Sequence, residues 1–458
     1  MKIFKAPSLL IGSTIVSIII SITSVNSYSA VSPDNLTHEK MLDNGLKVIV
    51  REDHRSPVII SQIWYKVGSS YESNGYTGLS HMLEHMMFKA SKNLKDGEFT
   101  KIIAEKGGQQ NAFTSNDYTG YYQLLSNVHL ETSFKLEAER MQNLSLDSAV
   151  LEKERQVVIE ERRMRTDDDP ISNTYERFLA AAHISSPYHQ PVIGWPDDLK
   201  NMNIKDLTDW YNTFYAPNNA TVVVVGDINA DDVFALANKY FGGLQKKDIP
   251  ASKPRNEMVP IGERQITVNI PAKLPYLIIA YNVPSFRTAE NKQDVYALEV
   301  INSILTGGNS ARLNKKLERE QEIVTSVDSS YDSFNLYDGL FTISAIPSRG
   351  KTIANLKVAI IKQLEELKSS TVTAQELERV KANLIAGKVY EQDSISQQAS
   401  AIGVLESINL SWRDYETYIE ALKQVTPEQI KLTAQKYFTE NRLTSATLQP
   451  KDIQLAKD

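Results

Sequence analysis

The second half of this chain repeats the first, and the repeat limits the folds open to it. Three pairs of segments match in the same order: residues 55–60 with 273–278, 81–84 with 296–299, and 207–218 with 430–441. The distance along the chain between the two members of a pair is nearly the same in all three. Each match alone is weak, but three at nearly one offset indicate a duplicated unit of roughly 200 residues, an ordinary domain size.

The order of predicted elements gives the fold class. Strand hairpins such as residues 47–50 and 58–65 alternate with helical segments such as residues 130–143. We therefore expect an α+β protein with two homologous domains, each a largely antiparallel sheet with helices packed on one face. The predicted division is a signal peptide at 1–30, a zinc-binding domain at 31–243, a linker at 244–262 and a second domain without metal at 263–458.

The N-terminus has the pattern of an export signal. Lys2 and Lys5 precede an apolar run over residues 9–25, and small residues follow up to Ala30. This pattern predicts a secretory signal peptide cut near Ser29 or Ala30. An uncleaved membrane anchor is the alternative, because the run is close to the shortest spanning length. We expect an exported protein, in the periplasm of a Gram-negative bacterium, with no membrane contact apart from this segment.

Composition excludes several classes of function. The net charge of −6 supplies no basic patch, so we expect no nucleic-acid partner. The chain has no cysteine, which rules out disulfides, thiolate metal ligands and cysteine nucleophiles. Any metal site must therefore use histidines and carboxylates.

One short stretch, His81-Met82-Leu83-Glu84-His85, carries the strongest chemical signal. It lacks glycine and proline, and on a helix its two histidines share one face, where they can bind one metal ion. Glu84 leans over the same site, so its carboxylate could accept a proton from an activated water. The order reverses that of the His-Glu-x-x-His helix of zinc hydrolases. The stretch predicts a zinc hydrolase.

A third ligand is best sought in residues 151–163. Glu154, Val157, Val158 and Glu161 follow helical spacing and form a single stripe. Two valines between two glutamates predict that this face turns inward, where a carboxylate needs a partner. A metal bound by Glu161, with Glu154 steadying the ligands, would supply that partner.

Solvated ion pairing is the alternative for any glutamate of this helix, since three arginines are close in sequence. For Glu152 and Glu160, which lie off the stripe, we favour it. His183 and His189 fall at no ligand spacing, and we expect both to be structural.

The repeat separates the fold from the chemistry. At the positions equivalent to His81 and His85 the second unit has Tyr296 and Val300, which cannot rebuild a two-histidine site. The metal site is therefore predicted in the first unit alone, and histidines are not needed for the helix to pack.

Taken together, these residues resemble the pitrilysin/insulinase (M16) family of zinc metallopeptidases, and within it bacterial relatives of the β subunit of the mitochondrial processing peptidase. The family has His-x-x-Glu-His and then, far along the chain, a zinc-binding glutamate, and the family spacing counted from His85 arrives at Glu161. Its additional acidic residue, seven positions earlier, matches Glu154. Residues 188–194 and 215–219 are also similar to the family's.

The resemblance implies a role for each residue. His81, His85 and Glu161 would bind one Zn²⁺ per chain, and Glu84 would be the catalytic base. An edge strand containing Asn111, Ala112 and Phe113 would bind an extended peptide by strand addition. The implied activity is that of a metalloendopeptidase acting on peptides or unfolded segments.

The chain departs from the family at one point. Active relatives use an arginine and a tyrosine, seven residues apart in the second domain, and alignment places Glu318 and Thr325 there. Neither residue can supply a cationic fork or a phenol to an oxyanion. We therefore expect a homo- or heterodimer in which another chain of the same fold supplies the pair. The alternatives are a chain that works alone with another group in that role, and a non-catalytic subunit.

Overall fold

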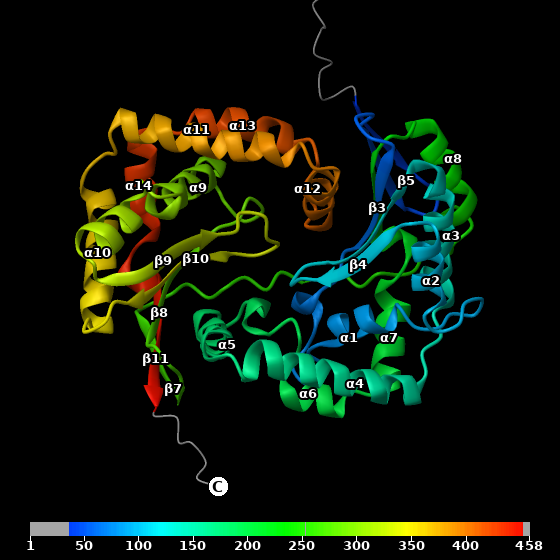
Figure 1. Ribbon diagram of the computed structural model, residues 1–458, viewed down its shortest axis with the longest axis horizontal. Coiled ribbons are helices and arrows are strands. Elements are labelled where there is room, and N and C mark those ends of the chain that lie inside the picture. The colour runs from blue at the N-terminus through cyan, green and yellow to red at the C-terminus, as the bar shows by residue number, and fades with distance from the viewer. Residues whose placement is uncertain (1–35, 252, 452–458) are drawn as a thin grey trace, which may run out of the picture.

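The computed structural model describes residues 36–451 except residue 252, and it contains two separate sheets surrounded by helices (Figure 1). The α+β class with two sheets is confirmed. The predicted signal peptide lies outside the described residues. None of the helices among the described residues is long and apolar enough to cross a membrane.

The first sheet has six strands in the order β1-β2-β6-β3-β5-β4. Neighbours are antiparallel except β2 and β6, which run parallel. The strand bounds are β1 Thr37–Met41, β2 Lys47–Glu52, β3 Val58–Tyr65, β4 Gln109–Thr114, β5 Thr119–Ser126 and β6 Ala220–Gly226. Strand β4 therefore lies at one edge of the sheet, with one side free of a strand partner among the described residues.

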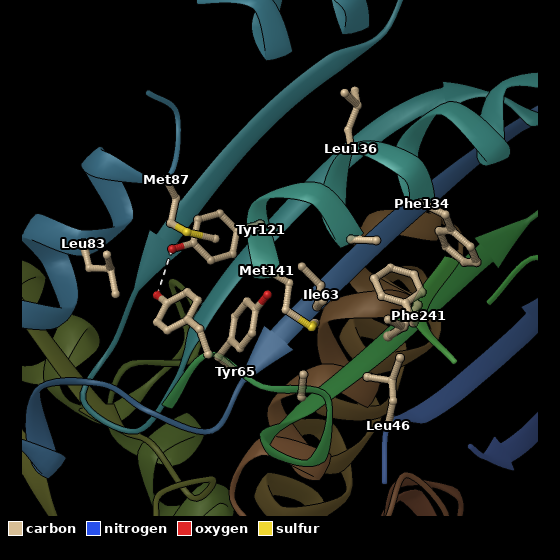
Figure 2. Packing of buried hydrophobic residues seen from close by; sticks show 14 of the residues in the cluster. Leu46, Ile63, Tyr65, Leu83, Met87, Tyr121, Phe134, Leu136, Met141 and Phe241 are labelled. Carbon is tan, nitrogen blue, oxygen red and sulfur yellow. Dashed lines mark hydrogen bonds between the residues drawn. The ribbon is translucent and has the colours of Figure 1, made fainter. Parts of the chain in front are cut away.

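The helices of the first half lie between and after these strands in the sequence. Their bounds are α1 Leu79–Met86, α2 Glu98–Glu105, α3 Leu130–Asn143, α4 Ser148–Arg162, α5 Pro170–Ala182, α6 Pro196–Asn201, α7 Ile204–Phe214 and α8 Ala230–Phe241. A π-helical turn, Arg163–Asp167, continues α4. The core of this half contains Leu46, Ile63, Tyr65, Tyr121 and Phe134, which pack between the sheet and its helices (Figure 2).

The second sheet has five strands in the order β7-β11-β8-β10-β9, again with one parallel pair, β7 with β11. The strand bounds are β7 Arg264–Pro271, β8 Tyr276–Val283, β9 Val324–Tyr331, β10 Gly339–Pro347 and β11 Leu443–Lys451. The helices of the second half of the chain are α9 Lys292–Thr306, α10 Ile353–Ser369, α11 Ala374–Glu391, α12 Ile395–Ser407, α13 Asp414–Lys423 and α14 Pro427–Tyr437, with a π-helical segment at Asn314–Glu320.

The elements repeat at the offsets predicted from the sequence. Strand β3 begins at Val58 and its counterpart β8 at Tyr276, whereas helix α7 begins at Ile204 and its counterpart α14 at Pro427. Helix α4 packs on α1 as α11 packs on α9. The duplication therefore extends to how the helices are arranged, while the predicted division of the chain into four segments stays a prediction.

Each half lends one helix to the sheet of the other half. Helix α5, between β5 and β6 in the chain, packs on β7, β8 and β11, whereas α12 packs on β3 and β6 (Figure 1). The prediction of helices on one face is therefore incomplete, because both faces of each sheet are covered. This explains the unbroken apolar run of β6: Val222 faces one layer, and Val223 contacts α12 on the other.

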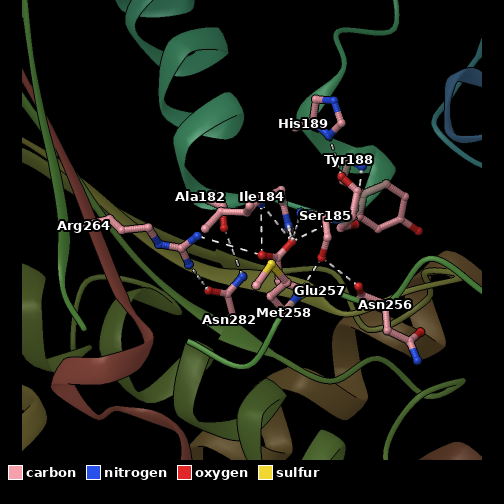
Figure 3. Close-up of polar contacts among 12 residues, drawn as sticks. Ala182, Ile184, Ser185, Tyr188, His189, Asn256, Glu257, Met258, Arg264 and Asn282 are labelled. Atoms are coloured by element: carbon pink, nitrogen blue, oxygen red, sulfur yellow. Dashed lines mark hydrogen bonds and ion pairs between the residues drawn. The ribbon is translucent and has the colours of Figure 1, made fainter. Parts of the chain in front are cut away.

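The predicted linker is a packed connection. The Glu257 side chain is buried, and its carboxylate accepts hydrogen bonds from the backbone N–H groups of Ile184 and Ser186, at 3.0 Å each, just after α5 (Figure 3). Burial opposes ionisation of Glu257, but the adjacent His183 and these N–H groups outweigh it and lower its pKa to about 2. The segment between the two sheets is thereby fixed to the first half.

Candidate functional site

Helix α1 begins at a crowded turn that only glycine can form. Gly78 has a φ of 85°, and a Cβ on it would lie 2.7 Å from the carbonyl oxygen of Ile193. Gly194, with a φ of 91°, packs against Gly78, and a Cβ on Gly194 would lie 2.8 Å from the Cα of Gly78. Residues 188–194, which resembled the family, thus support the start of α1.

A buried carboxylate completes this start. Glu72 accepts hydrogen bonds from the backbone N–H groups of Gly78 and Ser80, at 2.7 Å each. These N–H groups have no partner within the helix, so the carboxylate takes the place of a capping residue. Burial raises the pKa of Glu72 to about 8, despite both hydrogen bonds. No pattern in the sequence indicated this residue's role.

Helix α1 has an apolar face and a polar face, and the two histidines share the polar face as predicted. Met82, Leu83 and Met86 are buried in the core, whereas His81, Glu84 and His85 are half-buried. The two imidazole rings lie with centroids 4.8 Å apart. The helix therefore presents both histidines and the carboxylate together, at the wall of a cavity.

Helix α4 brings Glu161 to the two histidines. Glu161 Oε2 lies 3.3 Å from His85 Nε2 and 3.8 Å from His81 Nε2. One donor atom from each residue falls within 4.8 Å of the others, which makes this a group that could hold a metal ion. Tetrahedral zinc with bonds of about 2.0–2.2 Å puts two ligand atoms about 3.3–3.6 Å apart. The two distances to Glu161 are close to this range. Two imidazoles and one carboxylate fit zinc.

Glu154 lies on the same stripe and supports His85. Its Oε1 is 2.9 Å from His85 Nδ1, and its Oε2 is 2.7 Å from Lys89 Nζ. A carboxylate on the far nitrogen of a metal-binding histidine orients the ring and makes it a better ligand. One part of the stripe prediction is wrong: Val158 is buried, but Val157 is 50% exposed and lines the cavity.

The two histidines differ in their electrostatics. Burial, together with the neighbouring charge of His85, lowers the pKa of His81 to about 3. Burial also opposes protonation of His85, but Glu154 and Glu161 outweigh it and raise the pKa of His85. Metal binding requires neutral imidazole, so a cation bound here replaces the proton that these carboxylates otherwise favour on His85.

Glu84 is held by a neighbour on the edge strand. Thr114, the last residue of β4, donates its hydroxyl to Glu84 Oε2 at 2.6 Å. Burial raises the pKa of Glu84 although this hydrogen bond lowers it. A carboxylate with a raised pKa, beside a metal-binding group, is a better proton acceptor than an ordinary carboxylate.

A cavity of about 1470 Å³ contains the whole group. Its walls come from α1, β4, α4, the π-helical turn, α5 and residues 189–193, and Tyr276 of β8 is its contribution from the second sheet. Asn111, Ala112 and Phe113 of the edge strand β4 line it as well. The backbone N–H of Ala112 donates to the Asn111 side chain at 2.9 Å, so an incoming strand could take over this donor.

Several residues considered from the sequence lie outside the possible metal-binding group. Glu152 pairs with Arg155 and Glu160 pairs with Arg163, as favoured, although Glu160 also lines the cavity. His183 is buried beside Glu257, and His189 lines the cavity while its Nδ1 contacts the backbone of Ser186.

Neither residue at the expected arginine and tyrosine positions reaches the cavity. Glu318 accepts a hydrogen bond from Asn314, and Thr325 donates to backbone carbonyls of β10. Tyr331 donates to the carbonyl of Pro284. Within the described residues, the cavity-lining arginine is Arg165, which the sequence had not singled out.

Comparisons with known proteins match the chain over most of its length. A family profile described as Insulinase (Peptidase family M16) matches residues 47–194, and one described as Peptidase M16 inactive domain matches residues 201–384. The chain is 34% identical to a Helicobacter pylori protein named zinc protease PqqE, over 90% of this chain and 93% of that protein. It is 25% identical to an uncharacterized zinc protease of Bacillus subtilis, YmxG, over 87% and 95%.

Solved structures show the same architecture. A protease from Helicobacter pylori superposes with a TM-score of 0.86 at 33% identity, covering 90% of this chain and 99% of that one. The first half of the periplasmic protease PqqL from Escherichia coli superposes with a TM-score of 0.74 at 18% identity, covering 92% and 94%. This second likeness supports the fold alone.

Proposed function

Because this chain belongs to peptidase family M16, we propose that it is a zinc-dependent metalloendopeptidase that hydrolyses peptides or unfolded protein segments. The observation that carries the proposal is the convergence of His81, His85 and Glu161 on one point, with Glu84 beside them. We assign this chemistry to the unit 31–243, and a supporting role to the unit 263–458.

His81, His85 and Glu161 would hold one zinc ion, which when bound supplies an acidified water and polarises a carbonyl group. Glu84 accepts the proton of the attacking water and delivers it to the leaving amine as the peptide bond breaks. Thr114 keeps one oxygen of Glu84 occupied, so the other oxygen carries the proton. Glu154 fixes the ring of His85 through its Nδ1.

The edge strand β4 would bind the substrate main chain. A peptide added alongside it meets Asn111, Ala112 and Phe113, and main-chain pairing needs an extended substrate. A folded domain cannot supply such a strand, which is why we propose peptides and unfolded segments as substrates. We also propose export to a periplasm, because the N-terminus has the pattern of a signal peptide.

A zinc-removal assay tests the proposal. The chain loaded with one equivalent of zinc should cleave an unfolded polypeptide at internal bonds, as read by mass spectrometry. Removal of zinc by a chelator should abolish cleavage, and re-addition should restore it. Circular dichroism should show that the fold survives, since both cores lie outside the metal site. A zinc-loaded chain that leaves every peptide intact would count against hydrolysis.

A partner-dependent subunit is the second candidate, supported by Glu318 and Thr325 at the arginine and tyrosine positions. A monomeric preparation would then be nearly inactive until a homologous chain or a second copy is added. Assays on fractions of defined size, alone and mixed, separate the two candidates.

A further inference from the structure

The positively charged side chains that line the cavity differ in how exposed they are and in how many of their donors are left for a ligand. Two cationic residues, Lys89 and Arg165, line it within the described part of the chain. Lys89 is mostly covered, and its ammonium lies 2.7 Å from Glu154. The Arg165 side chain is 74% exposed, with one nitrogen 2.6 Å from Glu161 Oε1. A guanidinium has five N–H donors, so Arg165 keeps donors for a ligand in the cavity.

The turn after α4 explains why Arg165 faces the site. Three arginines follow Glu161 closely, and each takes a different direction. Arg162 is buried, with two nitrogens 2.7 and 2.8 Å from Glu176. Arg163 is not among the cavity-lining residues and is paired with Glu160. Arg165 sits in the π-helical turn Arg163–Asp167 and points back to the cavity.

Glu161 links this arginine to the metal-binding group. Its Oε2 faces the two histidine nitrogens, while its Oε1 contacts Arg165. The charge of Arg165 is also close enough to His81 and Glu84 to influence both groups. The guanidinium is therefore adjacent to the reacting centre, on the side from which α4 supplies Glu161.

We propose that Arg165 is a catalytic residue that donates hydrogen bonds to the oxygen of the scissile carbonyl. This proposal rests on the proposed peptidase function. As water attacks the carbonyl carbon, a new C–O bond forms and the π electron pair moves onto the carbonyl oxygen. When the C–N bond breaks, that pair returns and the amine leaves with the proton carried by Glu84. A cationic donor stabilises the oxygen while it bears the charge.

The consequence is that the chain supplies this charge itself. The cation comes from the first half, from the turn between α4 and α5, and requires no second chain. A preparation shown to be monomeric should therefore hydrolyse peptides, in contrast to the partner-dependent candidate.

Charge removal at Arg165 is the direct test. Arg165→Met keeps the aliphatic stem, Arg165→Lys keeps the charge without the fork, and Arg163→Met is the matched control in the same turn. With zinc content equal, Arg165→Met should lower kcat by about 100-fold with little change in KM. Arg165→Lys should recover part of this loss, and Arg163→Met should stay within about twofold of wild type. Wild-type kcat in Arg165→Met overturns the proposal.

A structural role for Arg165, through Glu161, predicts a different pattern. In that case Arg165→Met would weaken zinc binding in a chelator competition, and saturating zinc would restore activity; this result also overturns the proposal. If Arg165 contacts the oxyanion, zinc affinity should change little. A phosphinic peptide, which mimics the tetrahedral species, should then lose about as much affinity as kcat/KM loses.

Failure of the proposed function would look different again. If wild type loaded with zinc cleaves no peptide, the peptidase proposal falls, whatever the variants do. If wild type is active and Arg165→Met matches it, the peptidase stands and only the role of Arg165 is refuted.

Discussion

Helices α1 and α9 occupy equivalent places in the two halves, but one lines a cavity and the other is buried. In α1 the residues His81, Glu84 and His85 face the cavity. In α9 the equivalent positions are Tyr296, Glu299 and Val300, and Tyr296 and Val300 are buried. The carboxylate is kept in both, and each accepts a hydroxyl hydrogen bond, Glu84 from Thr114 and Glu299 from Ser333.

Aromatic packing closes the second site. Tyr296 contacts Phe286 and Tyr418, with ring centroids 4.9 and 5.6 Å away, and Phe334 stacks on Phe286. Helix α13, which carries Tyr418, lies against α9. Helix α9 is therefore held against α13 by packed aromatic rings, without a metal ion. In the described part of the first half, a cavity takes the place of such a cluster beside the polar face of α1.

The largest expected effect separates the two carboxylates. Glu84→Gln should keep zinc and lower kcat by about 10²–10⁴-fold, because the amide cannot accept the proton of the attacking water. Glu299→Gln, the matched change in the second half, should leave kcat within about twofold of wild type. Zinc analysis and peptide hydrolysis of both variants provide the measurement. Equal losses in the two would break the comparison.

The next effect concerns stability, and here the larger loss is expected in the second half. Tyr296→Ala removes a buried aromatic side chain, so it should cost about 3 kcal/mol or more of unfolding free energy. His81→Ala removes a smaller side chain, 12% exposed, and should cost less unfolding free energy than Tyr296→Ala in the zinc-free protein. Denaturant unfolding of both variants, each beside zinc-free wild type, makes the comparison. A larger loss in His81→Ala would mean that the first site is structural.

Much of this difference could be read from the sequence. The offsets between matching segments predicted which elements correspond, and the loss of both histidines at Tyr296 and Val300 predicted one metal site. The family spacing counted from His85 predicted Glu161, which the fold brings to the histidines. These features could be predicted because local pattern and spacing can be read without knowing how distant segments pack together.

Other features depend on contacts between distant segments and could not be predicted. The exchange of α5 and α12 arises from which sheet each helix covers. Thr114 reaches Glu84 only because β4 ends beside α1. Arg165 reaches the cavity through a π-helical turn, which helical periodicity does not anticipate. Val157 lies in the regular part of α4 and faces the cavity, because periodicity does not show whether a helix face meets packed side chains or open space.

An intermediate effect is expected at Glu154. Glu154→Gln weakens the hydrogen bond to His85 and the pair with Lys89, so zinc affinity should fall about 10–100-fold while one zinc still binds at saturation. Glu152→Gln is the control, because Glu152 lies on the outer face of the same helix. Chelator competition measures both. Unchanged zinc affinity in Glu154→Gln would show that α4 contributes Glu161 alone.

The smallest effect tests how the halves are joined. The folded-state pKa of Glu257 lies near 2, below its ordinary value of 4.5. Its contribution to stability is therefore complete above pH 4.5 and is lost as pH falls towards 2. Glu257→Gln should lower the unfolding free energy by about 1–2 kcal/mol at pH 7, since charged hydrogen bonds to Ile184 and Ser186 weaken.

The same variant provides a check on the sign. The difference between wild type and Glu257→Gln should shrink as pH decreases below 4.5, as the wild-type carboxyl gains its proton. A difference that grows with acidity would show that this carboxylate does not join the linker to the first half as described.

The central claim is that one half of a duplicated fold binds the metal and the other does not. Anomalous diffraction at the zinc absorption edge, on crystals of the zinc-loaded chain, tests it most directly. We predict one strong peak per chain, between His81, His85 and Glu161, and none beside Glu299. A peak at the second position, or none among the three predicted ligands, would contradict this account.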